Sequence, residues 1–316
     1  MRGIEIAAFG GPEVLVVREL PEPVPSPGQE VFTVRAAGVN FADTHQIEDS
    51  YLAGQRLPLI PGVEVVVAGP DGTRRLGLVP SGGYAERIAL DPRTLFPIPD
   101  EVSDAQALAL LVQGATAWHL LRTSAHLAPG ETVVVQAGAG GVGTLAIQLA
   151  RRWGAGRIIA TASSASKREL ARELGADVAL DAGEPELARR LQEANDGRGV
   201  DVVLEMTGGV VFDESLKALA PWGRLVTFGM AGRTAPTPIA PGALMARSTA
   251  VIGFWLVHLT QRPAMLAEAV ADLMAMVAAG ELRVVIGASY PLDQAADAHR
   301  ALRDRSSVGK LVLRLT

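Results

Sequence analysis

The feature that most constrains this chain is the alternation of short apolar runs with helix-like segments between residues 131 and 256. Runs rich in valine and isoleucine predict buried strands, and the segments between them carry apolar residues at helical spacing. The predicted strands are 132–136, 157–162, 177–181, 201–206, 224–229 and 249–256, and the predicted helices are 142–153, 166–174, 185–195 and 211–220. Strands that alternate with helices in this way predict a parallel, doubly wound sheet.

The regions on either side of this alternation have a different pattern. The first hundred residues predict strands at 13–20, 30–39, 63–68 and 84–90, and the proline-rich PEPVPSPG between the first two excludes a helix there. Further predicted elements are helices at 103–112, 114–126, 263–279 and 292–303, and strands at 282–287 and 310–315. A chain of 316 residues is longer than one hydrophobic core usually supports, so we expect two domains.

Composition excludes several classes of function. The net charge of -5 provides no basic field for nucleic acid or an anionic membrane surface. Glu5 interrupts the only apolar run near the N-terminus, and no apolar run is long enough to cross a bilayer, so we expect a cytoplasmic protein. The absence of cysteine excludes disulfides, thiolate zinc sites and a cysteine nucleophile.

A glycine-rich turn joins the first predicted strand of the alternation to its helix. QAGAGGVG contains Gly138, Gly140 and Gly143 in the pattern G-x-G-x-x-G. In a dinucleotide-binding turn the first glycine permits the tight turn, the second lets the backbone approach a pyrophosphate, and the third lets the helix pack on the strand. The pyrophosphate would bind N–H groups at the positive end of the helix dipole. A tight turn without a ligand is the alternative, and the complete alternation downstream favours dinucleotide binding.

The end of the second strand of the alternation indicates which dinucleotide is preferred. NAD usually needs an acidic residue there, about 20 residues past the first glycine, to bind the ribose hydroxyls. After Glu131 the next acidic residue is Glu169, and the strand runs instead into serines followed by Lys167. Hydroxyls and a cation suit a 2′-phosphate, which predicts NADPH. Alternatively Ser166 caps the next helix and Lys167 is a solvated first-turn residue, and both interpretations can hold because a capping hydroxyl also lies at a phosphate-binding helix end.

Short motifs spread over the whole chain carry a family resemblance. They are GGPEVLVV near the start, AAGVNFAD at 36–43, LIPGVE at 59–64, GGYAE at 82–86, QGATAWHLL at 113–121, QAGAGGVG at 136–143, GFWL at 253–256 and VGKLVL at 308–313. With these motifs the chain resembles the medium-chain dehydrogenase/reductase superfamily. More narrowly, it is similar to the zinc-independent quinone oxidoreductases of the zeta-crystallin type and to the related enoyl thioester reductases.

The resemblance implies an α/β fold in which one domain interrupts the other. A Rossmann NADPH-binding domain at 114–256 would be inserted into a mostly β, GroES-like catalytic domain formed by 1–113 plus 257–316. The nicotinamide and the substrate would bind between the two domains. The family also implies a homodimer that pairs through the edge of the cofactor-domain sheet.

The resemblance also implies that the catalytic metal is missing. Zinc-dependent relatives have a cysteine where this chain has Asn40 and a histidine where it has Val63. The five histidines show no metal-ligand spacing, so we expect them on the surface or in packing positions, with no metal bound. Without a Lewis acid the reaction must need less help at oxygen. Conjugate reduction fits, because hydride goes to a β-carbon and hydrogen-bond donors can stabilise the enolate or quinol oxygen.

Candidate site residues follow from the matched motifs. Asn40 supplies an amide N–H at the former ligand position. Tyr51 lies eleven residues later, the spacing of the tyrosine proposed as proton donor in enoyl thioester reductases, or it is an aromatic side chain at the rim of the cleft. Asp43 and Glu64 match family elements that we expect to be structural. The implied cofactor-binding residues are Gln113, Thr116, Gly138, Gly140, Gly141, Val142, Gly143, Ser163, Lys167, Phe228, Gly229, Phe254, Trp255, Leu256 and Lys310.

The function implied is an NADPH-dependent reductase of a small quinone or α,β-unsaturated carbonyl compound. An enoyl thioester reductase acting on acyl carriers is one alternative, and a non-catalytic, crystallin-like NADPH-binding protein is another. Two departures bear on the substrate pocket and the cofactor. The segment AGPDGTRRLGLVPS is shorter than in the family and lacks its G-D-R-V element, and a tyrosine that often flanks the adenosine phosphate is replaced near Asp181.

Overall fold

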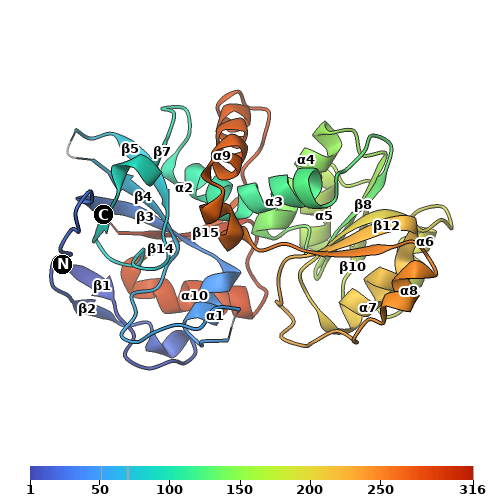
Figure 1. Cartoon of the computed structure of the whole chain (residues 1–316), viewed down its shortest axis with the longest axis horizontal. Helices are drawn as coiled ribbons and strands as arrows, with labels where there is room; N and C mark the ends of the chain where they lie inside the picture. Colours follow the sequence, from blue (N-terminus) through green and yellow to red (C-terminus); the bar gives the residue numbers. More distant parts are fainter. Residues whose placement is uncertain (51, 70, 316) are drawn as a thin grey trace. The chain divides into compact units, whose positions relative to one another are not determined.

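The computed structural model describes residues 1–50, 52–69 and 71–315 (Figure 1). The chain forms two compact units, of which unit 1 contains Met1–Gln113 and Val270–Thr316 and unit 2 contains Gly114–Ala269. Residues 257–269 therefore group with unit 2, whereas the family resemblance assigns them to the catalytic domain. The functional domain limits, 114–256 against 1–113 plus 257–316, stay a prediction.

Unit 2 is built on a six-stranded sheet in which every neighbouring pair is parallel. Its strands are β8 (Thr132–Val135), β9 (Arg157–Ala162), β10 (Val178–Asp181), β11 (Val200–Glu205), β12 (Leu219–Thr227) and β13 (Ala250–Gly253). The spatial order is β10-β9-β8-β11-β12-β13, so the strand order reverses between β8 and β11. This is the doubly wound Rossmann order, which confirms the fold predicted from the strand–helix alternation.

Helices cover both faces of this sheet. The connecting helices are α4 (Gly141–Arg152), α5 (Ala165–Glu173), α6 (Leu187–Glu193) and α7 (Gly209–Ala218). Right-handed crossovers place α4 and α5 on one face and α6 and α7 on the other (Figure 1). Unit 2 also contains α3 (Ala115–His119), the π-helical turn η4 (Leu120–Ser124), α8 (Pro241–Met245) and the 3₁₀ turn η5 (Leu256–Gln261). Since both faces are covered, the central strands read as continuous apolar runs.

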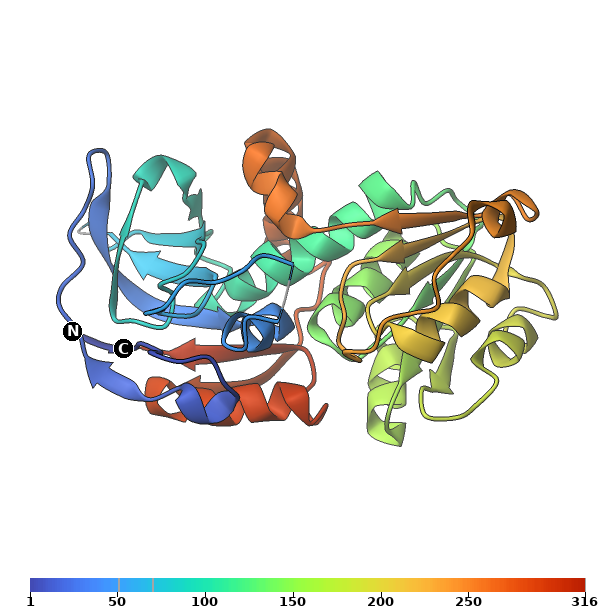
Figure 2. The same cartoon turned by 60° about the horizontal axis from the view of Figure 1, so that its bottom comes forward.

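Unit 1 is built on a seven-stranded, mostly antiparallel sheet of order β14-β15-β3-β4-β5-β7, with β6 paired to β3. Its strands are β3 (Glu30–Val39), β4 (Glu64–Ala68), β5 (Arg74–Leu78), β6 (Arg87–Leu90), β7 (Phe96–Pro97), β14 (Ile286–Pro291) and β15 (Lys310–Arg314). A separate two-stranded sheet pairs β1 (Arg2–Ile4) with β2 (Val17–Glu19). Strand β15, from the end of the chain, lies between β14 and β3, which comes from the beginning of the chain (Figure 2). The mostly β, GroES-like fold expected for this part is thereby confirmed.

Short helices complete unit 1. They are η1 (Pro12–Val14), α1 (Phe41–Gln46), η2 (Pro92–Thr94), α2 (Asp104–Ala109), the π-helical turn η3 (Leu110–Gly114), η6 (Leu292–Gln294) and α10 (Ala295–Arg303). The limit between the units at residue 269 falls inside α9 (Pro263–Ala278). The core of unit 1 packs β-sheet residues such as Val34 and Val67 against Ala298 of α10, and Tyr84 is fully buried among them.

Several predicted strands differ in extent from the observed ones, and 13–20 and 282–287 are two of them. In 13–20 only Val17–Glu19 pairs, because Pro12 starts a 3₁₀ turn over the preceding residues. Strand 282–287 is displaced toward the C-terminus, since β14 begins at Ile286 and pairs with β15 as far as Pro291. The apolar residues 282–285 suggested a strand, but backbone pairing with β15 selects the more polar segment that follows. No helix among residues 1–50, 52–69 and 71–315 combines the length and the apolar character needed to span a bilayer.

Candidate functional site

Most of the predicted cofactor residues lie at one edge of the unit 2 sheet. The glycine turn follows β8, Ser163 follows β9, Phe228 and Gly229 follow β12, and Phe254 follows β13. Because all these strands are parallel, their carboxyl ends meet at the same edge. Ligands of open α/β sheets bind at this edge, near the point where the strand order reverses. The structure therefore brings together residues that are up to about a hundred positions apart in sequence.

The glycine turn needs its third glycine for steric reasons. A Cβ atom on Gly143 would overlap the carbonyl oxygen of Ala137 and lie 2.8 Å from the Cα of Gly138. Within the turn, Gly138 N–H donates to Thr161 O (2.8 Å) and Gly140 N–H donates to Ala137 O (2.8 Å). Ala137 itself has a φ of 51°. The backbone thus turns tightly enough for α4 to begin directly beside β8.

The N-terminus of α4 is available to an anion. Gly140 is its N-cap residue, and no side-chain hydrogen bond caps the helix among the described residues. The N–H groups of the first turn, from Gly141 to Gly143, precede the first intrahelical donor, Thr144, and are oriented along the helix axis. Such groups, together with the helix dipole, favour a phosphate. A helix of 12 residues provides a full set of aligned peptide dipoles behind them.

The end of β9 carries hydroxyls and a cation and no carboxylate. Ser163 is exposed, and Ser164 caps α5 by accepting the N–H of Lys167 (3.3 Å). The interpretation in which Ser166 caps this helix is therefore wrong, because its hydroxyl lies 3.1 Å from that of Ser164 instead. Burial lowers the pKa of Lys167. Ser163 follows β9 directly, and Lys167 lies in the first turn of α5, so both belong to the segment that follows this strand.

The neighbouring cation is engaged elsewhere. Arg168 donates to Asp181 Oδ2 (2.6 Å) at the end of β10. Gly183 N–H and Arg168 together lower the pKa of the Asp181 carboxyl. The ion pair lies where the family resemblance leads us to expect a replaced tyrosine. Among the described residues at this end of β9, Lys167 is then the lysine predicted to meet a phosphate.

Glu205, at the end of β11, is a residue of this edge that sequence reasoning missed. Its side chain is fully buried, and Oε1 accepts the N–H groups of Thr207 (2.6 Å) and Gly208 (2.8 Å). Its Oε2 has no hydrogen-bond partner among the described residues, and burial raises the pKa of the carboxyl. The signal was present in DVVLEMTGG, where an acidic residue ends an apolar strand directly before a turn. Glu205 shapes the turn beside the reversal of strand order.

A second missed set ties the strand ends together. Thr161 Oγ1 donates to Gln136 Oε1 (2.5 Å), and Gln136 Nε2 donates to Ser215 Oγ (3.0 Å). These buried bonds connect β9, the turn after β8 and α7. The hydrogen bonds fix the start of the glycine turn relative to β9 and α7.

The aromatic residues after β13 are half-buried and pack against unit 2. Phe254 N–H donates to Thr227 O (2.9 Å), and the Phe254 ring stacks on His119 with centroids 6.1 Å apart. The Trp255 ring meets His258 edge-on, at 5.3 Å. Both side chains thus have packing partners, whereas the backbone through Leu256 continues along the sheet edge. Their predicted contact with the cofactor would involve main-chain atoms.

Gln113 and Thr116 lie on one continuous helical stretch that runs from η3 into α3. Both are buried, with 8% and 7% of their surface exposed. Gln113 Oε1 has no hydrogen-bond partner among the described residues. A buried acceptor without a partner costs about 1–3 kcal/mol, so this oxygen is suited to a ligand N–H. Their contact with the nicotinamide end of a cofactor stays a prediction.

The predicted catalytic residue Asn40 belongs to a buried polar cluster in unit 1, defined here as Asn40, Asp43, Glu64, Tyr84, His299 and Lys310. Asn40 caps α1, and its N–H donates to Asp43 Oδ2 (2.8 Å), which confirms the capping role expected for Asp43. Asn40 Nδ2 donates to Glu64 Oε2 (3.2 Å), and Lys310 Nζ donates to Asn40 Oδ1 (2.9 Å). Lys310 also forms an ion pair with Glu64.

Lys310 is placed deep in unit 1. Its side chain has 0% exposure, and its two partners among the described residues, Glu64 and Asn40, belong to the same buried cluster. Glu64 Oε1 accepts the N–H of Val112 (2.7 Å), so the structural role expected for Glu64 is confirmed. The contact between Lys310 and the cofactor stays a prediction. An ammonium group has three hydrogens, and two of them are used by Asn40 and Glu64, so one remains for such a contact.

The other half of the buried polar cluster is a chain of three side chains. Tyr84 Oη donates to Asp43 Oδ2 (3.2 Å) and lies 3.1 Å from His299 Nε2. Burial raises the pKa of Asp43 to about 7, chiefly by desolvation of the carboxylate. Burial lowers the pKa of His299 to about 3, and the Arg303 charge adds to the effect. These three buried side chains connect α10 to the residues around Asn40.

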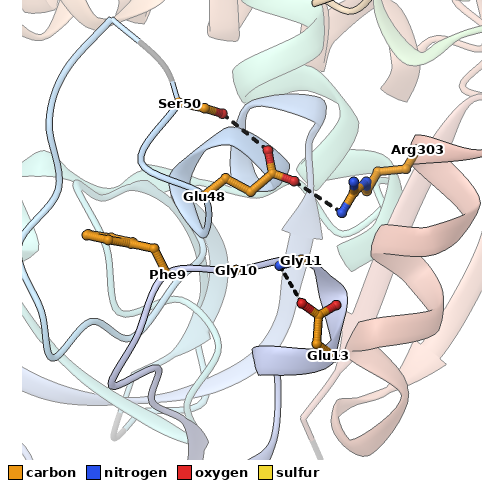
Figure 3. A pocket seen from close by; sticks show the side chains of 7 residues that line it. All are labelled: Phe9, Gly10, Gly11, Glu13, Glu48, Ser50 and Arg303. Atoms are coloured by element: carbon orange, nitrogen blue, oxygen red, sulfur yellow. Dashed lines mark hydrogen bonds and ion pairs between the residues drawn. The ribbon is translucent and has the colours of Figure 1, made fainter.

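Tyr51, the predicted proton donor, lies outside the described residues. The preceding residue, Ser50, lines a surface pocket of 510 Å³ in unit 1 together with Phe9, Gly10, Gly11, Glu13, Glu48 and Arg303 (Figure 3). Its polar groups bind one another, since Arg303 pairs with Glu48 (3.1 Å) and Gly11 N–H donates to Glu13 (2.8 Å). None of the predicted site residues that the structure describes lines this pocket, and we assign it no chemistry.

The histidines occupy packing or surface positions, as expected. His45, His119 and His299 are buried, and His126 and His258 are exposed. Within the described part of the chain, no three His, Cys, Asp or Glu side chains come together as a potential metal site. The position of the missing histidine ligand, Val63, is half-buried at the start of β4.

Comparisons with known proteins agree with this architecture. A family model described as zinc-binding dehydrogenase matches residues 141–299, which excludes the positions of Asn40 and Val63. The chain is 35% identical to a quinone oxidoreductase of Pseudomonas aeruginosa, with 98% of each chain covered. It is 41% identical to the quinone oxidoreductase of Thermus thermophilus, solved alone and in complex with NADPH, with a TM-score of 0.89 and 100% of each chain covered.

The Escherichia coli quinone oxidoreductase, solved in complex with NADPH, superposes with a TM-score of 0.91 at 29% identity, with 100% of both chains covered. The similarity thus extends over both units and does not depend on the glycine turn alone. This chain belongs to the quinone oxidoreductases, the zinc-independent branch of the medium-chain dehydrogenase/reductase superfamily.

Proposed function

We propose that the protein is an NADPH-dependent reductase that transfers hydride to a quinone or an α,β-unsaturated carbonyl compound without a metal. The observation that carries the proposal is the uncapped N-terminus of α4 behind the glycine turn, next to a β9 end that lacks a carboxylate. The NADPH bound in the solved structures of the Thermus thermophilus and Escherichia coli relatives supports it.

The residues present fit NADPH. First-turn N–H groups of α4 would hold the pyrophosphate, and Ser163 with Lys167 would hold the 2′-phosphate. NADH would lack a partner for its ribose hydroxyls at the end of β9, because no acidic residue stands there. Gln113 Oε1, a buried acceptor without a partner among the described residues, would accept an N–H from the nicotinamide end.

The chemistry that NADPH supplies when bound is hydride donation. The contribution of the protein at the acceptor oxygen would be a hydrogen bond from the Asn40 amide, since Val63 and the absence of cysteine leave no ligands for a metal at this position. A proton for the product would come from Tyr51 or from water. An acceptor that is already electron-poor needs only this modest stabilisation, which favours quinones and enones over simple ketones.

The decisive experiment measures NADPH oxidation with 1,4-benzoquinone, 9,10-phenanthrenequinone and a set of α,β-unsaturated ketones. Turnover with at least one of them is expected, with a lower KM for NADPH than for NADH. Tight NADPH binding without turnover on any acceptor would instead favour a crystallin-like binding protein. Turnover restricted to acyl-carrier thioesters would favour an enoyl thioester reductase.

We further propose that the protein is a homodimer paired through β13. This strand pairs only with β12 in the six-stranded sheet, so its other edge is available to a second copy. Light scattering of the eluted protein tests the proposal, and a monomer at micromolar concentration would contradict it.

A further inference from the structure

The side-chain amide of Asn40 can act on a substrate oxygen only if its nitrogen is presented. An amide has a hydrogen-bond acceptor at Oδ1 and two donors at Nδ2, and the two ends have nearly the same shape. Rotation by 180° would present the acceptor instead and would repel a developing oxyanion. Whatever fixes the orientation of this amide therefore controls its usefulness in the proposed reaction.

Two buried neighbours both require the same orientation. The ammonium of Lys310 can only donate, so the atom that it contacts at 2.9 Å must be Oδ1. The Oε2 atom of Glu64 accepts at 3.2 Å, so the atom facing it must be Nδ2. One Nδ2 hydrogen then points to Glu64, and the other has no partner among the described residues. In the reversed orientation, both contacts would become repulsive.

The fold makes room for this arrangement. Lys310 begins β15, Asn40 follows the end of β3 and Glu64 begins β4, and β3 pairs with both of the other strands. The three side chains therefore meet at one end of three adjacent strands. Gly38, also on β3, is essential here, because a Cβ atom would overlap Glu64 Oε2 and lie 2.7 Å from Lys310 Nζ.

We propose that Lys310 and Glu64 are positioning residues that hold the Asn40 amide in one orientation, so that its remaining Nδ2 hydrogen is offered to the substrate carbonyl oxygen. The inference rests on the proposed reductase function. Lys310 then acts through Asn40 and needs no contact with the cofactor.

A double variant separates positioning from structural support. Lys310→Met alone would leave the Glu64 carboxylate buried and unpaired, which threatens folding. In Lys310→Met/Glu64→Gln no charge is left unpaired, and the Oε1 atom of the introduced glutamine can still accept the N–H of Val112. The Nε2 atom of that glutamine then faces Asn40 and favours the reversed amide, so kcat should fall by at least about tenfold. The KM for NADPH should stay within about twofold, since the cofactor contacts are unchanged.

Lys217→Met serves as the matched control, because this surface lysine pairs with Glu214 and lies outside the site. It should retain the kcat of the wild-type protein. If the buried pair has a purely structural role, the melting temperature and kcat that Lys310→Met lowers should both return to wild-type values in the double variant. Positioning predicts that it recovers the melting temperature alone, and a wild-type kcat in the folded double variant would overturn the proposal.

The orientation can also be observed without turnover. The chain has only two asparagines, Asn40 and Asn195, so protein labelled with ¹⁵N-asparagine gives two side-chain NH₂ groups. Asn195 donates to Gly199 O (2.7 Å) and Arg198 O (3.3 Å) and is an internal reference. In the cofactor-free double variant the Asn40 proton pair should shift, whereas the Asn195 pair should not.

The NMR and kinetic results together distinguish the possible failures. An unchanged Asn40 signal in the double variant would overturn the positioning role, whatever the value of kcat. If the wild-type protein reduces no quinone or enone, the proposed function fails by itself, and the NMR measurement still decides whether Lys310 and Glu64 orient Asn40.

Discussion

The two units hold their functional polar groups in opposite ways. In unit 2 the carboxyl edge of the sheet offers main-chain N–H groups, glycines and Lys167, and few side chains are needed. In unit 1 the buried polar cluster consists of charged and amide side chains that bind one another away from solvent. A backbone site tolerates changes of side chain but not added volume, whereas a side-chain cluster depends on the balance of buried charges.

The two regions also differ in how far they reach along the chain. The glycine turn and the end of β9 lie within residues 136–167 and form one local βαβ unit. The buried polar cluster joins Asn40 and Lys310, which are 270 positions apart. Local geometry therefore determines the first site, and strand register determines the second.

The same added methyl group should have its larger effect in the backbone site. Gly143→Ala puts a Cβ atom onto the carbonyl oxygen of Ala137, and main-chain atoms cannot move aside without opening the turn. We expect a loss of roughly 3 kcal/mol in the free energy of unfolding, together with at least about a 100-fold weaker affinity for NADPH. Urea unfolding and fluorescence titration measure the two effects.

The control for this substitution is Gly242→Ala in α8, where nothing lies within 4 Å of the added carbon. It should leave NADPH binding unchanged. Normal binding by Gly143→Ala would show that the turn is looser than the structure indicates.

The corresponding change in unit 1 should cost less. Gly38→Ala directs a Cβ atom at the Lys310–Glu64 ion pair, and the ends of these side chains can shift more easily than a backbone can. We expect a loss of about 2 kcal/mol in the free energy of unfolding and a lower kcat. The affinity for NADPH should stay close to that of the wild-type protein. An effect on NADPH affinity as large as that of Gly143→Ala would remove the distinction between the two regions.

The pH dependence of stability should reveal two opposing groups in the buried polar cluster. The pKa of Asp43 rises from 3.8 to about 7 on folding, so this group lowers stability as pH increases between about 4 and 7. The pKa of His299 falls from 6.5 to about 3, so this group raises stability as pH increases between about 3 and 6.5. Over the shared range the two contributions offset each other.

Replacing either group should make the contribution of the other to the pH dependence of stability measurable. Relative to the wild-type protein, Asp43→Asn should gain about 2 kcal/mol in the free energy of unfolding when pH rises from about 4.5 to 6.5, and His299→Gln should lose a similar amount. Urea unfolding at the two pH values measures the difference. If stability depends on pH in the same way in both variants and in the wild-type protein, the opposite contributions of Asp43 and His299 are contradicted.

The smallest expected effect concerns a single charge in unit 2. Lys167→Ala should raise the KM for NADPH by about tenfold, equivalent to about 1.4 kcal/mol, and should barely change the KM for NADH. Steady-state kinetics with both cofactors tests this, with Lys217→Ala as the surface control. Equal effects on NADPH and NADH would refute the 2′-phosphate role.

Sequence reasoning succeeded where structure is local. The βα alternation predicted the Rossmann sheet, and QAGAGGVG located the turn because the steric need for Gly143 arises from Ala137 and Gly138 within the same turn. It was less successful where pairing partners are distant. The strand at 282–287 was displaced because β15 selects Ile286–Pro291. The cap of α5 was a local error, since Ser164, two residues before Ser166, accepts the N–H of Lys167.

The amino-acid sequence alone determined the parallel sheet, the tight glycine turn and the lack of cysteine ligands for zinc, because these depend on residue type, periodicity and short spacings. Only the tertiary structure decided the partners of Asn40, the burial of Lys310 and the proton balance between Asp43 and His299. The physical reason is that a buried hydrogen bond depends on strand register and desolvation, and neither is encoded near the residues that it joins.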